Sequence, residues 1–508
     1  MNSLIPLYVV IPLGTAFLTI ILGRWFKAIS KILTIPALLF LTGLTFYLIS
    51  QSPQTIVYRV GGFADLLDIP LAIFLVADGF TNILLLIISV VGLLVALYSL
   101  DYTKRFSAEE KFYALLNLMI AGMYGVVLAG DIFNLYVFLE IASIASYVLV
   151  AFNIEKQQLE ATFKYQILGG VSSLLILAAI GFIYWTTGTL NLADIARQLP
   201  DANAFQIFVS VLLISGFGLK AAMVPFHSWL PDAHSSAPSP ISAMLSGVLI
   251  KAIGIYVIIR LFFNIIQINP QIALTVTILG TLSMIIGVFL AIGQWDFKRL
   301  LAYHSISQMG YVILGIGMGM LILANGGKES IANLAITGGL FHMLNHSIFK
   351  ALLFLNAGSV EYITGTRSLQ KLGGLSNKMQ ITSGSSFAAS MAISGIPPFN
   401  GFFSKIMIIF AAIQAGYYWL ALLAVIVSIV TLASFTKVHK YAFYGDLPSK
   451  YENVKESPFS MALAMSLMAL LCLIMSLMIV PSVRAIFLQP AVDALMQTTN
   501  YSSIVLGK

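Results

Sequence analysis

The stretch GFGLKAAMVPFHSWLPDAHSSAPSPISAMLSGVLIK, residues 216–251, places two lysines inside otherwise apolar segments. Lys220 follows a helix interrupted by Gly216 and Gly218, and Lys251 lies within the next apolar segment. A charged side chain at bilayer depth costs free energy and normally marks an ion or proton route. Interrupted hydrophobic helices are the best sequence pointer to a transport site. The stretch therefore predicts half of a proton path.

The composition of the 508 residues indicates a membrane protein. Hydrophobic residues make up 59% of the chain and charged residues 9%, and the mean hydropathy is +0.95. A soluble domain carries about 25% charged residues, so this chain would not cover its own surface in water. We therefore expect an all-α polytopic membrane protein embedded in the lipid bilayer.

Charge and cysteine content exclude several classes of function. The formal net charge of +7 follows the tendency of Lys and Arg to collect in cytoplasmic loops, so no nucleic acid is expected. Cys472 is the only cysteine, which excludes disulfides within the chain and cysteine-ligated iron–sulfur clusters. The sequence shows neither a phosphate-binding glycine loop nor a nucleophile–base pair. We expect no cofactor and no catalytic centre on this chain.

Apolar runs between charged or Gly/Pro-rich breaks predict fourteen transmembrane helices, since a helix needs about 20 apolar residues to cross the hydrocarbon core. Their limits are 4–22, 30–50, 71–100, 112–129, 132–152, 163–186, 205–230, 240–264, 271–293, 300–323, 330–356, 380–416, 417–440 and 458–481. No positive charge precedes Arg24, so the first run is expected to remain as a helix rather than be cleaved as a signal peptide.

Two of these spans are broken, and their spacing predicts an inverted repeat. Span 7 is broken at Gly216–Gly218, and span 12 at GIPPFNG, residues 395–401. The breaks lie five spans apart, and because five is odd the second unit is inverted relative to the first. Spans 4–8 and 9–13 are the predicted repeats. The domains expected from this division are 1–111, a three-helix segment; 112–264, the first repeat; 271–440, the second repeat; and 441–508, a cytoplasmic loop and the last helix.

Lys and Arg predict the orientation. Placing Arg24, Lys27 and Lys31 in the cytoplasm, and changing sides after each span, puts seventeen basic residues in the cytoplasm and six opposite. That bias predicts both termini on the non-cytoplasmic side. Arg260 and Lys508 count among the six, and Lys298 among the seventeen.

Four lysines remain inside the spans: Lys220, Lys251, Lys350 and Lys405. Glu140 is the acid placed at matching depth, and it lies two spans from Lys220. A lysine held between burial and a nearby carboxylate can bind and release a proton near physiological pH. One lysine alone fits a structural or snorkelling role, since insertion costs only about 2.5–3.5 kcal/mol. Four lysines, two of them beside helix breaks, favour a proton path.

Histidines extend the predicted path. His342, His346 and Lys350 stand at i, i+4 and i+8 on one helical face, and neutral imidazole accepts a proton at one nitrogen and donates from the other. His304 lies one span earlier, and His227 is expected at the cytoplasmic mouth. Polar bonds between helices, worth about 0.6 kcal/mol each, are the structural alternative for each histidine. A metal or haem site is not supported, because HExxH and paired histidines on two helices are absent.

At Glu140, Lys220, FHSWLPDA, Lys251 and the GIPPFNGFFSK segment, the chain resembles the antiporter-like proton-translocating subunit family. That family includes the pump subunits of complex I, the antiporter-like subunits of membrane-bound hydrogenases, and the D and A subunits of Mrp-type sodium/proton antiporters. The resemblance covers spans 4 to 13 and implies fourteen helices with two inverted five-helix repeats.

The resemblance implies a role for each matching residue. Glu140 matches the glutamate that partners the pump lysine, Lys220 matches that lysine, and Lys251 matches the residue connecting the two halves. His342 matches the histidine of the eleventh helix, and Lys405 the residue at the outward half-channel. His227, His304, His346 and Lys350 support this axis.

The resemblance implies a multi-subunit complex in the plasma (inner) membrane or another energy-transducing membrane. The expected partners are homologous antiporter-like subunits, small membrane subunits and, in an oxidoreductase, peripheral redox subunits. The expected ions are protons, with sodium as a further candidate. The favoured function is the ion-translocating subunit of a dehydrogenase resembling NADH:quinone oxidoreductase or of a hydrogenase translocase. The alternatives are the D-type subunit of an Mrp antiporter and a secondary transporter that works alone.

Overall fold

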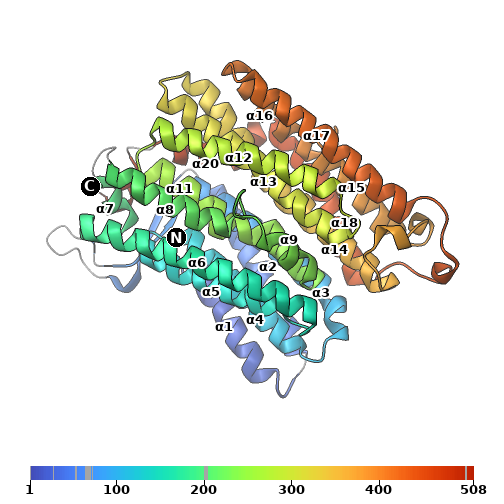
Figure 1. The fold of residues 1–508 in the computed structure, drawn as a ribbon. Helices are drawn as coiled ribbons and strands as arrows, with labels where there is room; N and C mark the ends of the chain where they lie inside the picture. Colours follow the sequence, from blue (N-terminus) through green and yellow to red (C-terminus); the bar gives the residue numbers. More distant parts are fainter. Residues whose placement is uncertain are drawn as a thin grey trace.

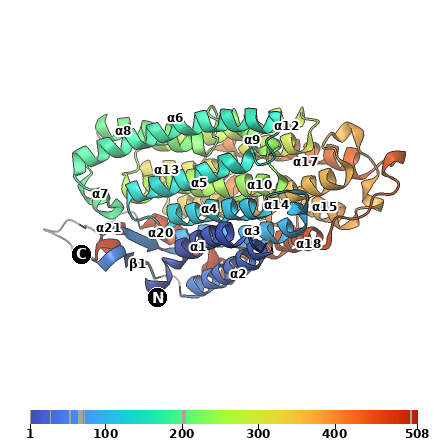
Figure 2. The ribbon, with the colours of Figure 1, turned by 90° about the horizontal axis from the view of Figure 1, so that it is seen from below.

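The structure, a computed structural model, describes residues 2–26, 28–51, 54–62, 70, 72–199, 204–497 and 500–507. This part of the chain forms a bundle of helices lying side by side, with one two-stranded sheet (Figure 1, Figure 2). Lys27 and Lys508, which entered the orientation count, lie outside the described residues.

The helices follow one another with short connections. The first half contains α1 (Leu7–Leu22), α2 (Ile29–Ser50), α3 (Gly79–Tyr102), α4 (Glu109–Leu128), α5 (Ile132–Val150), α6 (Lys156–Thr187), α7 (Leu192–Gln198), α8 (Ala204–Lys220), α9 (Trp229–Ser236), α10 (Ser239–Met244) and α11 (Tyr256–Arg260). The second half contains α12 (Pro270–Ile292), α13 (Phe297–Ala324), α14 (Glu329–Thr364), α15 (Gln380–Ser394), α16 (Asn400–Gln414), α17 (Tyr418–Val438), α18 (Phe459–Ile474), α19 (Pro481–Phe487), α20 (Gln489–Met496) and α21 (Tyr501–Leu506).

The predicted all-α polytopic fold is confirmed. Eleven helices among the described residues are long and apolar enough to cross a membrane. Each of the fourteen predicted spans overlaps a helix, or a pair of short helices where a break was expected. The broken seventh span is α8 followed by α9, and the broken twelfth span is α15 followed by α16.

The third span begins later than the sequence predicts, at Gly79 instead of residue 71. Strand β2 (Phe74–Ala77) precedes it and pairs antiparallel with β1 (Ile56–Arg59), with Ile56 opposite Ala77. The helix starts where Asp78 caps it, because the Asp78 carboxylate accepts a hydrogen bond of 2.9 Å from the Thr81 backbone N–H. Hydropathy alone does not distinguish an apolar strand from the first turns of an apolar helix.

The eighth span contains π-helical turns and lies at the centre of the bundle. Three five-residue π turns, Leu245–Leu249, Lys251–Ile255 and Leu261–Ile265, accompany α10 and α11. The apolar stretch that identifies this span is fully buried inside the bundle, so the span holds Lys251 away from lipid. Short π segments inside helices also occur often at functional sites.

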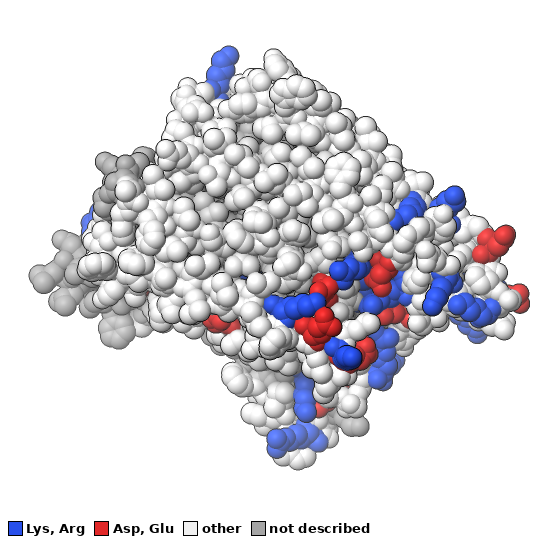
Figure 3. Space-filling model, viewed as in Figure 1, with Lys and Arg blue, Asp and Glu red and all other residues white. Residues whose placement is uncertain are grey.

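The two ends of the bundle differ. At one end, Asp232 forms salt bridges with Lys164 and Arg299, and Arg367 pairs with Asp296. We call this the charged end; Figure 3 shows charged side chains gathered there, over the ends of α4, α9 and α14. At the opposite end, α20 packs against α3 and α21 against α7. These short helices after α18 were not predicted, because the sequence indicated one last helix only.

Two basic residues that the orientation count placed on the two sides of the membrane are buried instead. Arg260 is 3% exposed and pairs with Asp78 through two hydrogen bonds of 2.7 and 2.8 Å. Lys298 is 1% exposed, and its Nζ donates to the Ala237 backbone carbonyl at the C-terminus of α9. Both residues lie in the interior because groups distant in sequence compensate their charge.

Candidate functional site

The break in the seventh span positions Lys220. Helix α8 ends at Lys220, and Ala222 adopts φ +52°, a left-handed conformation that non-glycine residues rarely take. The chain resumes a helix at Trp229, whose indole N–H donates to the Leu219 carbonyl over 2.9 Å. A strained residue held beside an ionisable side chain is typical of functional sites.

Glu140 and two serines surround Lys220. The Lys220 Nζ lies 3.5 Å from the Glu140 Oε1 and donates to the hydroxyls of Ser143 and Ser173, each over 3.1 Å. The Ser173 hydroxyl donates to the same Glu140 oxygen over 2.5 Å. Ser173 therefore bridges the lysine and the carboxylate, and it provides a path for a proton between them.

Glu140 is less deeply placed than the sequence indicated. Its side chain is 27% exposed, whereas that of Lys220 is 1% exposed. The carboxylates buried among the described residues include Asp78 and Asp194. The pair therefore combines a sequestered lysine with an acid that reaches the side of the bundle.

A close packing contact joins the Lys220 region to Lys251. A Cβ atom added at Gly254, in the π turn Lys251–Ile255, would lie 2.8 Å from the Ala221 Cβ and backbone nitrogen. Glycine at this position lets the two segments touch. The Lys251 Nζ itself donates to the Ser246 backbone carbonyl over 2.7 Å, one π turn earlier.

His346 belongs to a cluster of basic side chains. Lys251, Lys350, His342 and His234 all act electrostatically on it. All five side chains are buried. The Lys350 Nζ and both His346 ring nitrogens make no hydrogen bond to another described group. Lysine and histidine both exchange protons, so side chains of this basic cluster have the chemistry to pass a proton between them.

His342 connects the basic cluster to the second broken span. Its Nδ1 lies 2.9 Å from the Ser404 hydroxyl, and its Nε2 lies 3.2 Å from the Gln308 side-chain oxygen. Ser404 immediately precedes Lys405 on α16. The eleventh and twelfth spans therefore place a histidine beside the last lysine of the predicted axis.

Lys405 lies at the break between α15 and α16. Its Nζ donates to the Ile393 carbonyl over 2.7 Å and to the Ser428 hydroxyl over 3.2 Å, and it lies 4.7 Å from the centre of the Tyr311 ring. Lys405 also lines a cavity of about 210 Å³ between α15, α16 and α17. Gly395 ends α15 with φ +77°, and a Cβ there would lie 3.0 Å from the Lys405 side chain.

The remaining supporting histidines take different places. His304 is buried, with its Nε2 2.8 Å from the Ser434 hydroxyl, and the charges of Lys350 and Lys405 act on it. His227 lies half-exposed in the break between α8 and α9, outside both helices. Asp232, five residues after His227, lies at the charged end in the salt bridges described above.

Sequence reasoning missed His234 and Lys298 as members of this region. Both are buried, and each lies beside residues already identified: His234 within the FHSWLPDAH segment, and Lys298 in the first turn of α13, which Asp296 caps. The available signal for His234 was its place in the stretch between Lys220 and Lys251, where the sequence analysis already expected a proton path. Among the described residues no group of three or more His, Cys, Asp and Glu side chains is arranged to hold a metal ion.

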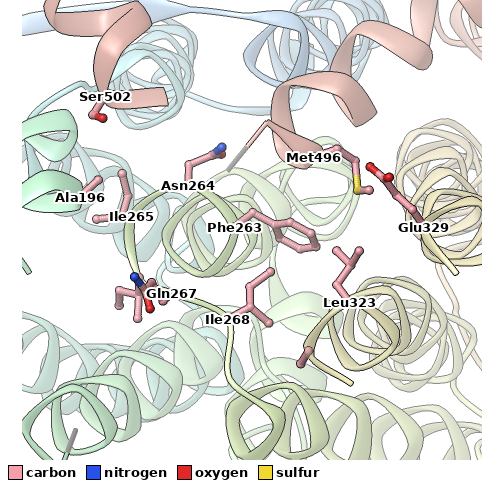
Figure 4. A pocket seen from close by; sticks show the side chains of 12 residues that line it. Ala196, Phe263, Asn264, Ile265, Gln267, Ile268, Leu323, Glu329, Met496 and Ser502 are labelled. Atoms are coloured by element: carbon pink, nitrogen blue, oxygen red, sulfur yellow. The ribbon is translucent and has the colours of Figure 1, made fainter. Parts of the chain in front are cut away.

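A separate cavity lies at the opposite end of the bundle. It has a volume of about 550 Å³ and none of the predicted site residues lines it. Figure 4 shows Phe263 and Asn264 at its centre, between Ser502 on one side and Glu329 on the other. Asn264 connects this cavity to the buried pair, because its side-chain oxygen accepts from Arg260 over 3.0 Å.

Comparison with known proteins gives relatives of two kinds. Residues 129–431 match the family model described as NADH:quinone oxidoreductase/Mrp antiporter, transmembrane. The chain is 36% identical over 380 residues to the D subunit of a Na(+)/H(+) antiporter from Alkalihalophilus pseudofirmus, covering 74% of each. It is 34% identical over 398 residues to the N subunit of the NADH-quinone oxidoreductase from Desulforudis audaxviator, covering 77% of this chain and 76% of that one. Its structure resembles a chain of the Mrp complex from a Dietzia species, with a TM-score of 0.88, 25% identity, and coverage of 100% of this chain and 99% of that chain.

Proposed function

This chain belongs to the NADH:quinone oxidoreductase/Mrp antiporter family, and we propose that it is the proton-translocating, antiporter-like subunit of a redox-driven membrane complex. The observation that carries the proposal is the line of buried basic side chains between the two broken spans. It begins at the Glu140–Lys220 pair, passes Lys251 and the basic cluster, and ends at Lys405.

The proposed mechanism moves a proton without making or breaking bonds to carbon. When Glu140 stays close, its carboxylate stabilises the Lys220 ammonium through the contact of 3.5 Å and through Ser173. A shift of Glu140 away from the lysine leaves a buried ammonium without its partner, which is strongly unfavourable. The lysine then releases its proton toward Lys251. The chain holds no electron carrier in this proposal, so electrons travel in other subunits, and electron transfer is coupled to this chain through contacts between neighbouring chains.

Similarity to the N subunit of an NADH-quinone oxidoreductase supports the redox-driven complex. The partners in this proposal are homologous antiporter-like subunits, small membrane subunits and peripheral redox subunits. The orientation follows the sequence: the charged end faces the cytoplasm, and both termini lie on the other side. The axis uses protons, with sodium as a further candidate ion.

A second function is favoured by a specific observation. The relative at 36% identity is named as the D subunit of a sodium/proton antiporter, and the structural match at TM-score 0.88 belongs to an Mrp complex. An experiment separates the two. The intact complex is purified from its host, reconstituted into vesicles, and supplied either with an electron donor or with a sodium gradient. Proton movement that needs the donor supports the redox-driven complex, and movement driven by the sodium gradient alone supports the antiporter.

The proton path is tested in the same vesicles. Lys220→Ala and Glu140→Ala should abolish proton translocation, and Lys328→Ala, at an exposed lysine, should leave it unchanged. Undiminished translocation in both axis variants would refute the path. Uptake of a small solute by the purified single chain would instead support a transporter that works alone.

A further inference from the structure

A cavity lies at the charged end of the bundle, and Lys298 is part of its wall. It has a volume of about 300 Å³ and lies where the ends of α3, α9 and α14 meet the start of α6 and α13. Polar and charged side chains line it, including Arg105, Gln158, Glu361 and Arg367. None of the nine residues that the sequence predicted for the proton path belongs to this lining.

Lys298 lies in the wall of this cavity although it is 1% exposed. Its Nζ donates to the Ala237 carbonyl, the cap of α9, so the ammonium lies at the negative end of that helix dipole. Glu361 and Asp296 attract it, and Arg367 and Arg105 repel it. Lys298 therefore lies between the water-accessible cavity and the interior.

His234 occupies the next position inward. It lies on the last turns of α9, three residues before Ala237. Its imidazole is fully buried between the rings of Trp229 and Phe354, and neither ring nitrogen bonds to another described group. Three ammonium groups act electrostatically on it: Lys350 and Lys251 from the basic cluster, and Lys298 from the cavity wall. Unpaired polar atoms of a buried side chain are rare and require an explanation.

We propose that the cavity is the mouth of a proton inlet at the charged end, and that Lys298 and His234 carry protons from it to the basic cluster. The inference rests on the proposed function, because it supplies the protons that the axis moves. In the first step an N–H bond of the Lys298 ammonium breaks and one forms on a nitrogen of His234. The neutral Lys298 amine then takes a proton from a hydronium ion in the cavity, which leaves a water molecule. In the second step an N–H bond on the other nitrogen of the His234 imidazolium breaks, and one forms on the Lys350 Nζ when that group is a neutral amine.

The alternative role of Lys298 is to cap α9, and substitution separates the two. Arginine keeps the positive charge and can bond the Ala237 carbonyl, but it does not release a proton in a protein. Histidine can exchange a proton. We therefore compare Lys298→Arg, Lys298→Met and Lys298→His in the intact complex reconstituted into vesicles. Lys378→Met, at an exposed lysine of the charged end, is the control.

The initial rate of proton translocation, divided by the amount of assembled complex on a native gel, is the readout. Both Lys298→Arg and Lys298→Met should lower the rate at least about tenfold, since proton transfer by a positioned side chain contributes roughly 10²–10⁴ in rate. Lys298→His should retain a larger rate that varies with pH between about 5 and 8. Translocation by Lys298→Arg at the wild-type rate would assign Lys298 to capping and overturn the inlet.

Lys220→Ala in the same series separates this inference from the proposed function. If Lys220→Ala abolishes translocation while all Lys298 variants work normally, the inlet is wrong and the function stands. If Lys220→Ala works normally, the proposed function itself fails.

Chemical blockade tests the inlet should the Lys298 variants not assemble. Ser236 lines the cavity, and Cys472, the one natural cysteine, is buried and shielded from reagent. A bulky charged thiosulfonate applied from the charged end to Ser236→Cys should lower translocation, whereas modified Lys378→Cys should work normally. Full translocation by completely modified Ser236→Cys would overturn the inlet.

Discussion

Replacing Ser173 by alanine tests how the acid and the lysine of the first half-path are coupled. The Ser173 hydroxyl carries one proton, and its short contact of 2.5 Å with the Glu140 carboxylate takes that proton. Its oxygen accepts from the Lys220 ammonium over 3.1 Å. Alanine removes both interactions and leaves the direct contact of 3.5 Å between the two charges.

The size of the effect expected for Ser173→Ala follows from the energies of these hydrogen bonds. A hydrogen bond to a charged group contributes roughly 1.5–3 kcal/mol, and each 1.4 kcal/mol corresponds to a factor of about ten. Because the Glu140 side chain is 27% exposed, solvent weakens the interaction and the lower part of the range applies. We therefore expect Ser173→Ala to lower the rate of proton translocation about tenfold in reconstituted complex.

Ser172→Ala is the matched control. Ser172 is also buried, on the same turn of α6, but its hydroxyl donates to the Gly216 carbonyl over 2.7 Å, a bond that involves neither charge. It should keep most of the translocation rate. An equal loss in both variants would show that packing between α6 and α8 is responsible. The double variant Glu140→Gln/Ser173→Ala gives a second test. If Ser173 acts through Glu140, adding Ser173→Ala to Glu140→Gln should cause little further loss of translocation rate, because the effects of coupled residues are not additive. A further full loss would refute the bridge.

Three further predictions concern other parts of the bundle. Gly395→Ala should lower proton translocation, and Gly416→Ala should not. Both substitutions place alanine at a positive φ, near +77° and +79°, which costs roughly 1–2 kcal/mol of stability, but only the Cβ at position 395 meets an axis lysine. Equal translocation rates in the two variants would refute a role for that contact. Asp78→Asn should lower the thermal stability of the purified complex far more than Glu160→Gln. Removing one partner of the buried Asp78–Arg260 pair costs about 3–5 kcal/mol, whereas the exposed Glu160–Lys164 pair is worth about 1 kcal/mol or less, and equal melting temperatures would contradict this. Lys378→Cys should react with an impermeant maleimide only from the cytoplasmic side of sealed vesicles, and labelling from the other side would reverse the predicted orientation.

The spans and the breaks could be predicted because their signals are local. A single sequence shows apolar runs of sufficient length, and it shows Gly218 and Gly401 two and four residues before lysines. The four axis lysines also stand out, because each is a charged residue inside a predicted apolar span. These features need no knowledge of which helices touch.

What could not be predicted depends on contacts between distant residues. Arg260 reads as a residue at a span end, but it is buried because Asp78, 182 positions earlier, lies against it. Lys298 reads as a loop residue, but it bonds a carbonyl 61 positions away. The π turns around Lys251 have no pattern in the sequence, since their bonding depends on how tightly Gly254 packs against Ala221. Hydropathy assigns a depth to each residue but not a partner.

The basic cluster around His346 limits how many protons the middle of the chain holds at one time. No carboxylate is among the groups that act on His346, Lys251 or Lys350 in the described part of the chain. Like charges in a partly desolvated interior repel one another, and the repulsion grows as they come closer. Under the proposed function, a second proton is therefore expected to enter one end of the cluster only as the first leaves at the other. The number of protons that the cluster can hold, rather than the opening of a pore, would then limit the rate of translocation.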